Sequence, residues 1–262
     1  MPPSPSHPLI AVDIGNSRIK FGLFSGQGAN AGLPEPERTF DIQPQIDPLD
    51  GLESWLGAEG VTNVSWWIGS VHRRAASRLV DWLRDHGAQD ITLLASVDLP
   101  LVISLPRPDM VGIDRLLGAM AANRLRPANT AAVVVDLGTA ITVDMVSAEG
   151  AFLGGAILPG IGLASRALHE FTDLLPLMDM QSLAEPPAPL GTNTVEAMKS
   201  GIYWGAVGGV RHLIGLLSAG VSPAPRVFLT GGAAPSVAKL ISTEAVYVPN
   251  LVLSGIALAA QK

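Results

Sequence analysis

One pattern occurs twice in this chain, and it restricts the fold more than any other feature. An apolar run leads into Asp13 and Gly15, and a second apolar run leads in the same way into Asp136 and Gly138. Another apolar stretch follows each turn. The two Asp residues lie 123 positions apart, which is about the length of a domain. The repeat indicates a duplicated domain, and we predict an α/β fold with a cleft between two halves.

The repeat also suggests domain boundaries. We place an N-terminal domain at residues 9–124 and a C-terminal domain at residues 125–262. Residues 1–8, MPPSPSHP, are expected to form a short disordered tail. This segment has neither the basic region nor the apolar region of a secretory signal, so we expect a cytoplasmic protein.

The composition excludes several function classes. Hydrophobic residues make up 48% of the chain and charged residues 15%, as in a globular protein with a large core. The net charge of −6 argues against a general binder of nucleic acid or of an anionic membrane. Cysteine is absent, so disulfides, thiolate metal sites and a Cys nucleophile are excluded. No apolar run approaches the ~18 residues that a membrane-spanning helix needs.

Spacing and turn residues predict the main elements. The segment from His72 to Gly87 has apolar residues at helical spacing and a glycine stop, and a second helix is expected from about Gly112. Residues 28–51 are rich in Pro, Gly and acidic residues and predict irregular edge structure. A final helix is expected from about Ser254. The predicted strands are Leu9–Val12, Phe21–Phe24, Val64–Ile68, Ile91–Leu94 and Leu101–Leu105.

A long helix is predicted after the Pro-rich connector Glu185–Gly191. Asn193 with Glu196 three residues later resembles a capping box at its start. Four glycines inside this helix weaken it by roughly 1 kcal/mol each relative to Ala. We therefore expect another backbone to pack closely against them; they are Gly201, Gly205, Gly208 and Gly209.

Both Asp-x-Gly turns have the parts of a phosphate and metal site. A glycine lets backbone amides approach an anion, and Asn16, Ser17 and Thr139 add short polar side chains. A carboxylate at such a turn can hold a cation, or its water shell, that bridges phosphate oxygens. Each motif alone is also compatible with a plain hairpin, and it is the repetition that favours the site. Lys20 is either a phosphate contact or a solvated strand-end lysine.

A third glycine turn and two helix starts complete the candidate residues. Gly231 and Gly232 follow an apolar strand, where a nucleotide ring can lie on the backbone; an ordinary strand-to-helix turn is the alternative. Asp114 lies near a helix start, where the helix dipole and Arg115 favour the charged carboxylate. It could accept a hydroxyl proton during phosphoryl transfer, or simply face solvent. Thr194 could bind a substrate or satisfy its own helix.

Six segments together resemble the type III pantothenate kinase family of the acetate and sugar kinase/Hsp70/actin superfamily. They are DIGNSRIKFGLF, PDMVGIDR, VVVDLGTAITVD, FLGGAILPGIGLASRAL, GTNTVEAMKSGI and FLTGG, and they cover nearly the whole chain from about Leu9 to Ala260. The resemblance implies two ribonuclease H-like domains around a cleft, and a homodimer. It implies transfer of the ATP γ-phosphate to the terminal hydroxyl of pantothenate, which is the first step of coenzyme A synthesis.

The resemblance also implies roles for individual residues. Asp114 matches the catalytic base and Asp136 the ligand of a monovalent cation, K⁺ or NH₄⁺, while ATP is expected to bind with Mg²⁺ or another divalent ion. Pantothenate contacts are expected at Gly112, Ile113, Asp114, Arg115 and Thr194. ATP contacts are expected at Asp13, Ile14, Gly15, Asn16, Ser17, Arg18, Ile19, Lys20 and Thr139, to which the glycine turn adds Gly231 and Gly232.

Two positions depart from the family pattern. Ser17 replaces the usual Thr and keeps the hydroxyl, whereas Leu105 stands where many members have a Tyr that contacts the substrate. Leu105 therefore leaves open the alternative that the chain is a kinase whose substrate is another small molecule with a hydroxyl group. A nucleotide-binding accessory protein without catalysis is the alternative from another class, and the presence of Asp13, Asp114 and Asp136 speaks against it.

Overall fold

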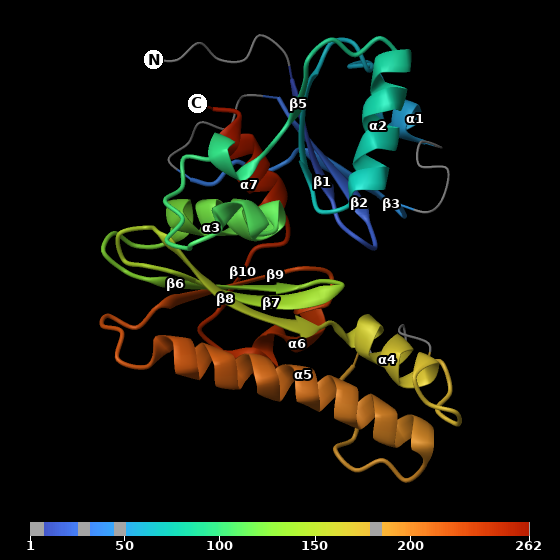
Figure 1. The fold of residues 1–262 in the computed structure, drawn as a ribbon, viewed down its shortest axis with the longest axis vertical. Coiled ribbons are helices and arrows are strands. Elements are labelled where there is room, and N and C mark those ends of the chain that lie inside the picture. Colours follow the sequence, from blue (N-terminus) through green and yellow to red (C-terminus); the bar gives the residue numbers. More distant parts are fainter. Residues whose placement is uncertain (1–7, 26–31, 45–50, 179–184, 262) are drawn as a thin grey trace. The chain divides into compact units, whose positions relative to one another are not determined.

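The computed structural model describes residues 8–25, 32–44, 51–178 and 185–261. The chain divides into two compact units, and each is described by itself (Figure 1). Unit 1 comprises Met1–Leu125 together with Asn250–Lys262, and unit 2 comprises Arg126–Pro249.

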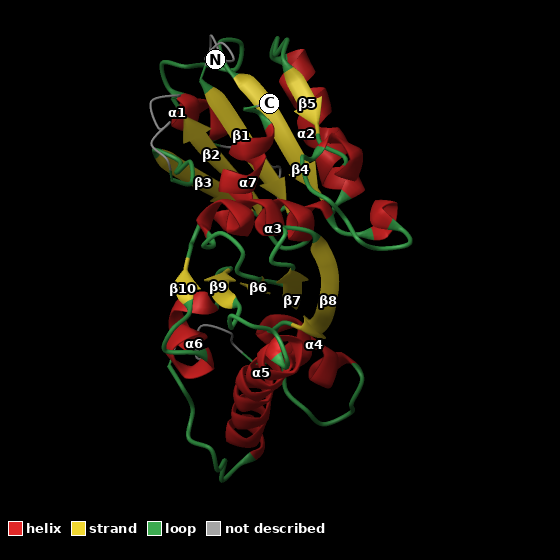
Figure 2. Ribbon diagram, turned by 90° about the vertical axis from the view of Figure 1, so that its left-hand side faces the viewer, coloured by secondary structure: helices red, strands yellow, loops and turns green. Residues whose placement is uncertain are grey.

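Unit 1 is a five-stranded mixed sheet with helices on both faces (Figures 1 and 2). The strand order is β3-β2-β1-β4-β5, in which β1 is antiparallel to β2 and parallel to β4. Two short 3₁₀ helices, η1 (Ser96–Asp98) and η2 (Pro108–Met110), precede α3. The elements are β1 Leu9–Ile14, β2 Ile19–Phe24, β3 Arg38–Ile42, α1 Leu52–Leu56, β4 Ser65–Ser70, α2 Arg73–Asp85, β5 Ile91–Leu93, α3 Ile113–Leu125 and α7 Leu251–Ala259.

The alternation of side chains along β1 assigns its two faces. Ile10, Val12 and Ile14 point into the core that α1 and α2 cover. The other face, which includes Asp13, lies on the side of α3 and α7, and α7 packs directly on β1 (Figure 1). Asp13 therefore belongs to the face of the sheet that these two helices cover.

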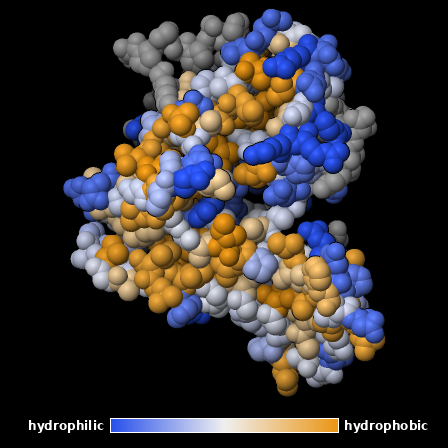
Figure 3. All heavy atoms as spheres, viewed as in Figure 1, coloured by the Kyte–Doolittle hydropathy of each residue, from blue (hydrophilic) through white to orange (hydrophobic). Residues whose placement is uncertain are grey.

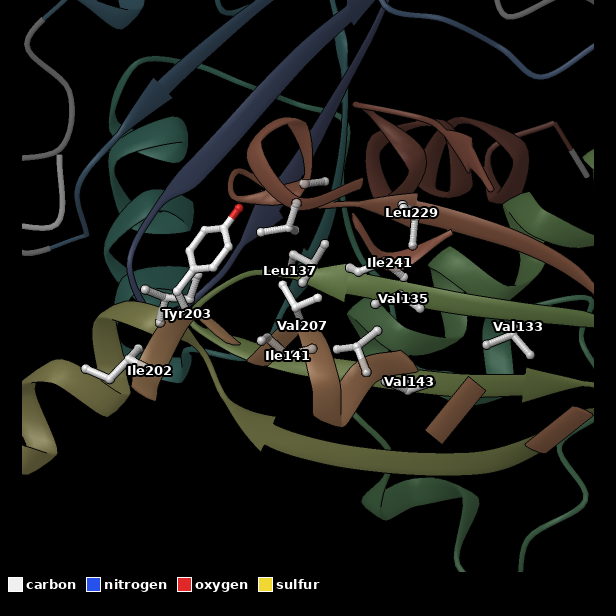
Figure 4. Packing of buried hydrophobic residues seen from close by; sticks show 14 of the residues in the cluster. Val133, Val135, Leu137, Ile141, Val143, Ile202, Tyr203, Val207, Leu229 and Ile241 are labelled. Carbon is white, nitrogen blue, oxygen red and sulfur yellow. The ribbon is translucent and has the colours of Figure 1, made fainter. Parts of the chain in front are cut away.

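Unit 2 repeats this architecture. Its strand order is β10-β9-β6-β7-β8, and its main core lies between the sheet and helices α4, α5 and α6 (Figure 4). The elements are β6 Ala132–Leu137, β7 Ala140–Val146, β8 Phe152–Pro159, α4 Ile161–Glu170, α5 Thr194–Ser218, β9 Arg226–Thr230, α6 Ala234–Ile241 and β10 Val246–Tyr247. Figure 4 shows Val207 and Tyr203 of α5 close to the valines of β6 and β7.

The two sheets correspond strand for strand. Reading unit 2 from its β8 edge gives β8-β7-β6-β9-β10, which matches β3-β2-β1-β4-β5 in connectivity. β6 is antiparallel to β7 and parallel to β9, just as β1 is antiparallel to β2 and parallel to β4. Asp13 and Asp136 are each the last residue but one of the corresponding strands. The predicted duplication is confirmed.

The last helix corrects the predicted domain division. The sequence places it in the C-terminal domain, but α7 belongs to unit 1, where it packs on α3 and β1. The physical reason is burial: α7 is apolar on nearly all sides, and its residues are almost all buried. At the other end, residues 1–7 of the predicted tail lie outside the described residues. Pro8 is ordered, because its carbonyl accepts a hydrogen bond from the Ser65 amide (2.9 Å).

Two element predictions are wrong. Residues 38–42 form the edge strand β3 instead of irregular structure, because Phe40 and Ile42 alternate with polar residues along it. Leu101–Leu105 is not a strand, although Ile103 makes an isolated β-bridge. Pro100 and Pro106 flank that segment and limit its pairing.

The long helix is confirmed, but its glycines are not packed as expected. Asn193 Oδ1 accepts a hydrogen bond from the Glu196 amide (3.0 Å), and Glu196 in turn accepts from the Thr192 amide (2.9 Å). Among the described residues no atom lies within 4 Å of a Cβ built at Gly201, Gly205 or Gly208, while at Gly209 it would lie 3.1 Å from a Leu158 methyl group. None of the helices in the described ranges is long and apolar enough to cross a membrane.

Candidate functional site

The hairpin between β1 and β2 presents an exposed polar turn. The Gly15 amide donates to the Arg18 carbonyl (2.9 Å), and Asn16, Ser17 and Arg18 are exposed. The Arg18 guanidinium is 2.6 Å from the Asp41 carboxylate of β3. The turn thus exposes short polar side chains at the end of a buried strand.

Charged side chains of both signs form a row across the strands next to this turn. Asp13 lies directly opposite Lys20 of β2, and Lys20 lies directly opposite Asp41 of β3. Directly opposite residues share a face of the sheet, so these three side chains are neighbours on one face. A lysine flanked in this way is held close to the Gly15–Arg18 turn and can contribute positive charge toward an anion there.

The carboxylate of Asp114 is held at the start of α3. It accepts a hydrogen bond from the Arg115 amide (2.8 Å), and the Arg115 amide also donates to the Gly112 carbonyl (3.1 Å). A Cβ at position 112 would lie 2.5 Å from Asp114 Oδ1, so a side chain there would displace the carboxylate. Ile113 between them is buried and anchors the turn.

The electrostatic prediction for Asp114 is wrong in its direction. Burial raises the pKa of this carboxyl above its ordinary value, and that effect outweighs the Arg115 amide and the positive charge of Arg115, which both lower it. We expected the helix dipole and Arg115 to dominate. A raised pKa makes the ionised carboxylate a stronger proton acceptor.

The start of α3 and the β1–β2 hairpin lie at the same edge of the sheet in unit 1. Val71, directly after β4, donates its amide hydrogen to the Ile14 carbonyl (3.0 Å). The same residue places a methyl carbon 3.6 Å from a Cβ built at Gly112. Ile14 precedes the turn and Gly112 precedes Asp114, so the structure brings Asp114 and the hairpin to one edge. Sequence reasoning missed Val71, which carries no polar group that would mark it.

The second Asp-x-Gly turn is more closely packed. Asp136 lies opposite Thr142 of β7 and Thr230 of β9. A Cβ at Gly231 would lie 2.5 Å from Asp136 Oδ1 and 2.6 Å from the Leu137 amide nitrogen. Gly231 also has φ +93°, which favours glycine. The structure therefore brings the predicted residues Asp136 and Gly231 into contact, and Gly232 beside them is exposed.

A further glycine lies at this turn that sequence reasoning did not select. The Gly160 amide donates to the Thr139 carbonyl (3.1 Å), and a Cβ at Gly160 would lie 2.3 Å from the Gly138 carbonyl oxygen. Gly160 lies between β8, which ends at Pro159, and α4. The Pro-Gly pair after a strand was the available signal. Three glycine-containing turns therefore pack together around Asp136 and Thr139.

The remaining predicted residues lie elsewhere. Thr194 is the first residue of α5 and is exposed, and Leu105 is half-buried in the segment between η1 and η2. Among the described residues, no three His, Cys, Asp or Glu side chains are grouped as a metal cluster would require. A cation at Asp13 or Asp136 would therefore depend on one protein carboxylate together with backbone, ligand or water oxygens.

Comparisons with known proteins agree with this geometry. A model of the family described as type III pantothenate kinase matches residues 9–215. The type III pantothenate kinase of Gluconobacter oxydans is 39% identical over 263 residues, covering 97% of this chain and 93% of that protein. The enzyme of the same name from Acidiphilium cryptum is 32% identical over 255 residues, covering 96% of this chain and 93% of that protein.

Solved structures support the fold. The ethanolamine utilization protein EutJ of Carboxydothermus hydrogenoformans has a TM-score of 0.54 at 12% identity, covering 100% of this chain and 92% of that one. The archaeal actin homologue Ta0583 has a TM-score of 0.51 at 15% identity, covering 97% and 99%. At these identities the likeness concerns the fold alone, which is the actin-like, duplicated ribonuclease H-like fold that the motifs imply. With the family model and relatives of this coverage, the chain belongs to the type III pantothenate kinase family.

Proposed function

We propose that this protein transfers the γ-phosphoryl group of ATP to the terminal hydroxyl of pantothenate. The product is 4'-phosphopantothenate, and the reaction is the first step of coenzyme A biosynthesis. The observation that carries the proposal is the half-buried Asp114 carboxylate at the start of α3, at the sheet edge that also holds the β1–β2 hairpin. Family membership over nearly the whole chain supplies the substrates.

Asp114 acts as the general base in this proposal. The substrate hydroxyl oxygen attacks the γ-phosphorus while its proton passes to the Asp114 carboxylate. The bond from the γ-phosphorus to the bridging oxygen breaks, and ADP leaves with that oxygen. Phosphoryl transfer depends mainly on positioning and charge stabilisation, so the base has to be well placed more than strongly basic. Gly112, Ile113 and Arg115 form the turn that presents it, and Arg115 and Thr194 are proposed contacts for pantothenate.

The β1–β2 hairpin binds the ATP phosphates in this proposal. Residues Asp13–Lys20 include the exposed turn residues Asn16 and Ser17, the hydroxyl of Ser17 and the ammonium group of Lys20. Asp13 would hold the hydrated divalent ion, Mg²⁺, that accompanies ATP. One carboxylate fits this task, because Mg²⁺ in kinases keeps several waters and is bound largely by substrate phosphates. The bound ion would neutralise the charge that develops on the phosphates.

The turn at Asp136 serves a different ion. We propose that the Asp136 carboxylate holds a monovalent cation, K⁺ or NH₄⁺, and that Thr139, Gly231 and Gly232 contact ATP. The donor chemistry fits, because Asp136 is a carboxylate whose Oδ1 lies against the backbone of Gly231. A set of oxygen ligands that carries one negative charge in total suits a monovalent cation.

The proposed assembly is a homodimer in the cytoplasm, without nucleic acid or membrane as partner. The exposed glycine face of α5 supports it, since Gly201, Gly205 and Gly208 would let a second backbone approach closely. Large apolar side chains are also exposed in unit 2, and Figure 3 shows apolar surface over this part of the chain. They are Phe171 (81% exposed), Leu174 (85%), Leu177 (59%) and Leu190 (79%).

Two experiments test these proposals. ADP release from ATP is measured with and without pantothenate, at high and low K⁺, and the product is identified by its mass. Absence of pantothenate-dependent turnover would overturn the proposed reaction. Sedimentation measures the assembly: Gly205→Glu should yield monomers, whereas Arg211→Glu, exposed on another side of α5, should not. A wild-type protein that sediments as a monomer would overturn the dimer.

A further inference from the structure

One leucine on α3 is fixed by glycines of two other elements. Leu117 lies one helical turn after Asp114 and is fully buried. Its Cδ1 occupies the space above Gly69 of β4, where a Cβ would lie only 2.8 Å away. Gly69 lies opposite Asp13 in the β1–β4 pairing. The absence of a side chain at position 69 therefore determines how deeply Leu117 seats on the sheet.

The second glycine belongs to α7. A Cβ at Gly255 would lie 2.3 Å from the Leu117 carbonyl oxygen and 2.8 Å from its carbonyl carbon. These are backbone atoms, so they cannot move aside as the end of a flexible side chain can. Ile256, next to Gly255, also reaches toward Gly69, with its Cδ1 3.5 Å from a Cβ built there. The backbones of α3 and α7 thus touch at Leu117.

The contacts of the Asp114 carboxylate itself do not fix α3 on the sheet. The hydrogen bond from the Arg115 amide and the close approach to Gly112 both involve neighbours in the chain, which move with the start of the helix. The packing of the helix also holds that start relative to β1 and β4. Leu117, one helical turn after Asp114, is packed against Gly69 on one side and Gly255 on the other.

We propose that Gly69 and Gly255 are positioning residues that act through Leu117 to place the Asp114 carboxylate for proton transfer. Neither glycine touches the substrate in this proposal. The inference rests on the proposed role of Asp114 as general base. It adds that the rate depends on a contact between α3 and the last helix of the chain.

The first test is Gly255→Ala. The new methyl group forces the two backbones apart by about 1 Å, and a displacement of that size at a reacting group can cost about 100-fold in rate. We expect kcat to fall about 100-fold while KM for ATP stays within twofold. The acid limb of the pH–rate profile should also move to lower pH, because a displaced carboxylate loses part of its burial. A folded variant with wild-type kcat and pH profile would overturn the proposal.

The second test does not depend on whether Gly255→Ala folds. Gly69→Ala presses only on a side-chain methyl group, so we expect a fall in kcat of about 10-fold. Leu117→Val removes the Cδ atoms, and the double variant Gly69→Ala with Leu117→Val should regain most of the lost rate. The proposal is wrong if the double variant shows no recovery of kcat. It is also wrong if Gly69→Ala lowers the affinity for ATP and leaves kcat unchanged, a result that would indicate that Gly69 acts through Asp13.

Gly22→Ala is the matched control. Its methyl group would press on Leu253 of α7 (3.2 Å) and on Pro36 (3.1 Å) without touching α3. It should lower the thermal midpoint and leave kcat at 25 °C unchanged.

Asp114→Asn tests the role of Asp114 as general base separately from the positioning role of the two glycines. If Asp114→Asn kept its rate, the base assignment would fail; if it were inactive while both alanine variants stayed fully active, only the positioning role would fail.

Discussion

The two units share one strand scaffold but surround the equivalent carboxylates differently. In unit 1 a four-residue turn, with Asn16, Ser17 and Arg18 exposed, follows Asp13, and Lys20 lies opposite it. In unit 2 the β6–β7 connection is only two residues long, and Gly231 lies directly against Asp136. The duplicated sheet therefore places a carboxylate at the same strand position twice, and the two carboxylates differ in the turn that lies beside them.

In the proposed function these two surroundings serve different ions. An open turn with a lysine leaves room for phosphates and for the water shell of a divalent ion. A turn packed on glycine backbone leaves little room for a water shell, which favours direct contact between a cation and oxygen ligands. In unit 1, Asp114 lies at the sheet edge that also holds the β1–β2 hairpin. In unit 2, the candidate residue at a helix start is Thr194, the first residue of α5.

The largest effect is expected for Asp114 of unit 1. Asp114→Asn should lower kcat by about 10²–10⁴-fold, the usual contribution of a general base, while ATP still binds. ADP release and a calorimetric titration with ATP measure the two quantities. Asp109→Asn is the matched control, because Asp109 lies five residues before Asp114, is exposed and is paired with Arg107 (2.6 Å). Equal rates for Asp114→Asn and Asp109→Asn would contradict the assignment.

The paired carboxylates should respond to different ions. Asp13→Asn is expected to raise KM for Mg-ATP at least 10-fold, because one ligand of the hydrated ion is lost. Asp136→Asn should instead flatten the dependence of the rate on K⁺ and change KM for ATP less. Initial rates over a matrix of Mg²⁺ and K⁺ concentrations separate the two. Identical ion responses in both variants would abolish the functional distinction between the units.

The pH dependence tests the burial of Asp114. Its raised pKa predicts that kcat rises with pH through a range above the ordinary value for a carboxyl group. The free energy of unfolding depends on pH in the opposite direction to kcat. The folded state holds the Asp114 proton more tightly than the unfolded state, so stability falls as pH rises through the raised pKa. Because an Asn side chain does not titrate, Asp114→Asn does not lose stability over this pH range. It should therefore melt at a higher temperature than the wild type at pH 7.5 and at nearly the same temperature at pH 3. A rate already constant from pH 4 upward would count against the buried carboxylate.

The smallest effects concern helix caps, one in each unit. Asn193→Ala should cost about 1 kcal/mol of unfolding free energy, because its side chain caps α5 through the Glu196 amide (3.0 Å). His72→Ala removes a longer cap on α2, from the Ala75 amide to Nδ1 (3.2 Å), and should cost less. Urea unfolding followed by circular dichroism measures both. A larger loss for His72→Ala would reverse this order.

Sequence alone predicted the parts of the fold that depend on local pattern. The Asp-x-Gly repeat predicted the duplication, and Asn193 with Glu196 predicted the start of α5, because strand periodicity and capping are visible within a few residues. The edge strand β3 and the placement of α7 were missed. Both depend on partners far away in the chain, and no local pattern records which sheet an apolar helix will cover.

The candidate site shows the same limit. Local chemistry and family resemblance select Asp13, Asp114 and Asp136, since carboxylates at turns and helix starts stand out in a sequence. The direction of the Asp114 pKa could not be predicted, because it depends on how deeply the start of α3 is buried. Gly160 and Val71 carry no polar side chain, and their importance lies in contacts that only the folded chain forms.

The packing of α7 has a consequence for synthesis on the ribosome. Unit 2 is continuous in sequence, so it can fold as soon as residue 249 has left the exit tunnel. Unit 1 is the first to be translated, yet one face of its sheet is covered by α3 alone until Leu251–Ala259 have been added. The part of β1 on which α7 packs stays exposed during that interval, so the N-terminal half of the protein is the last to be completed.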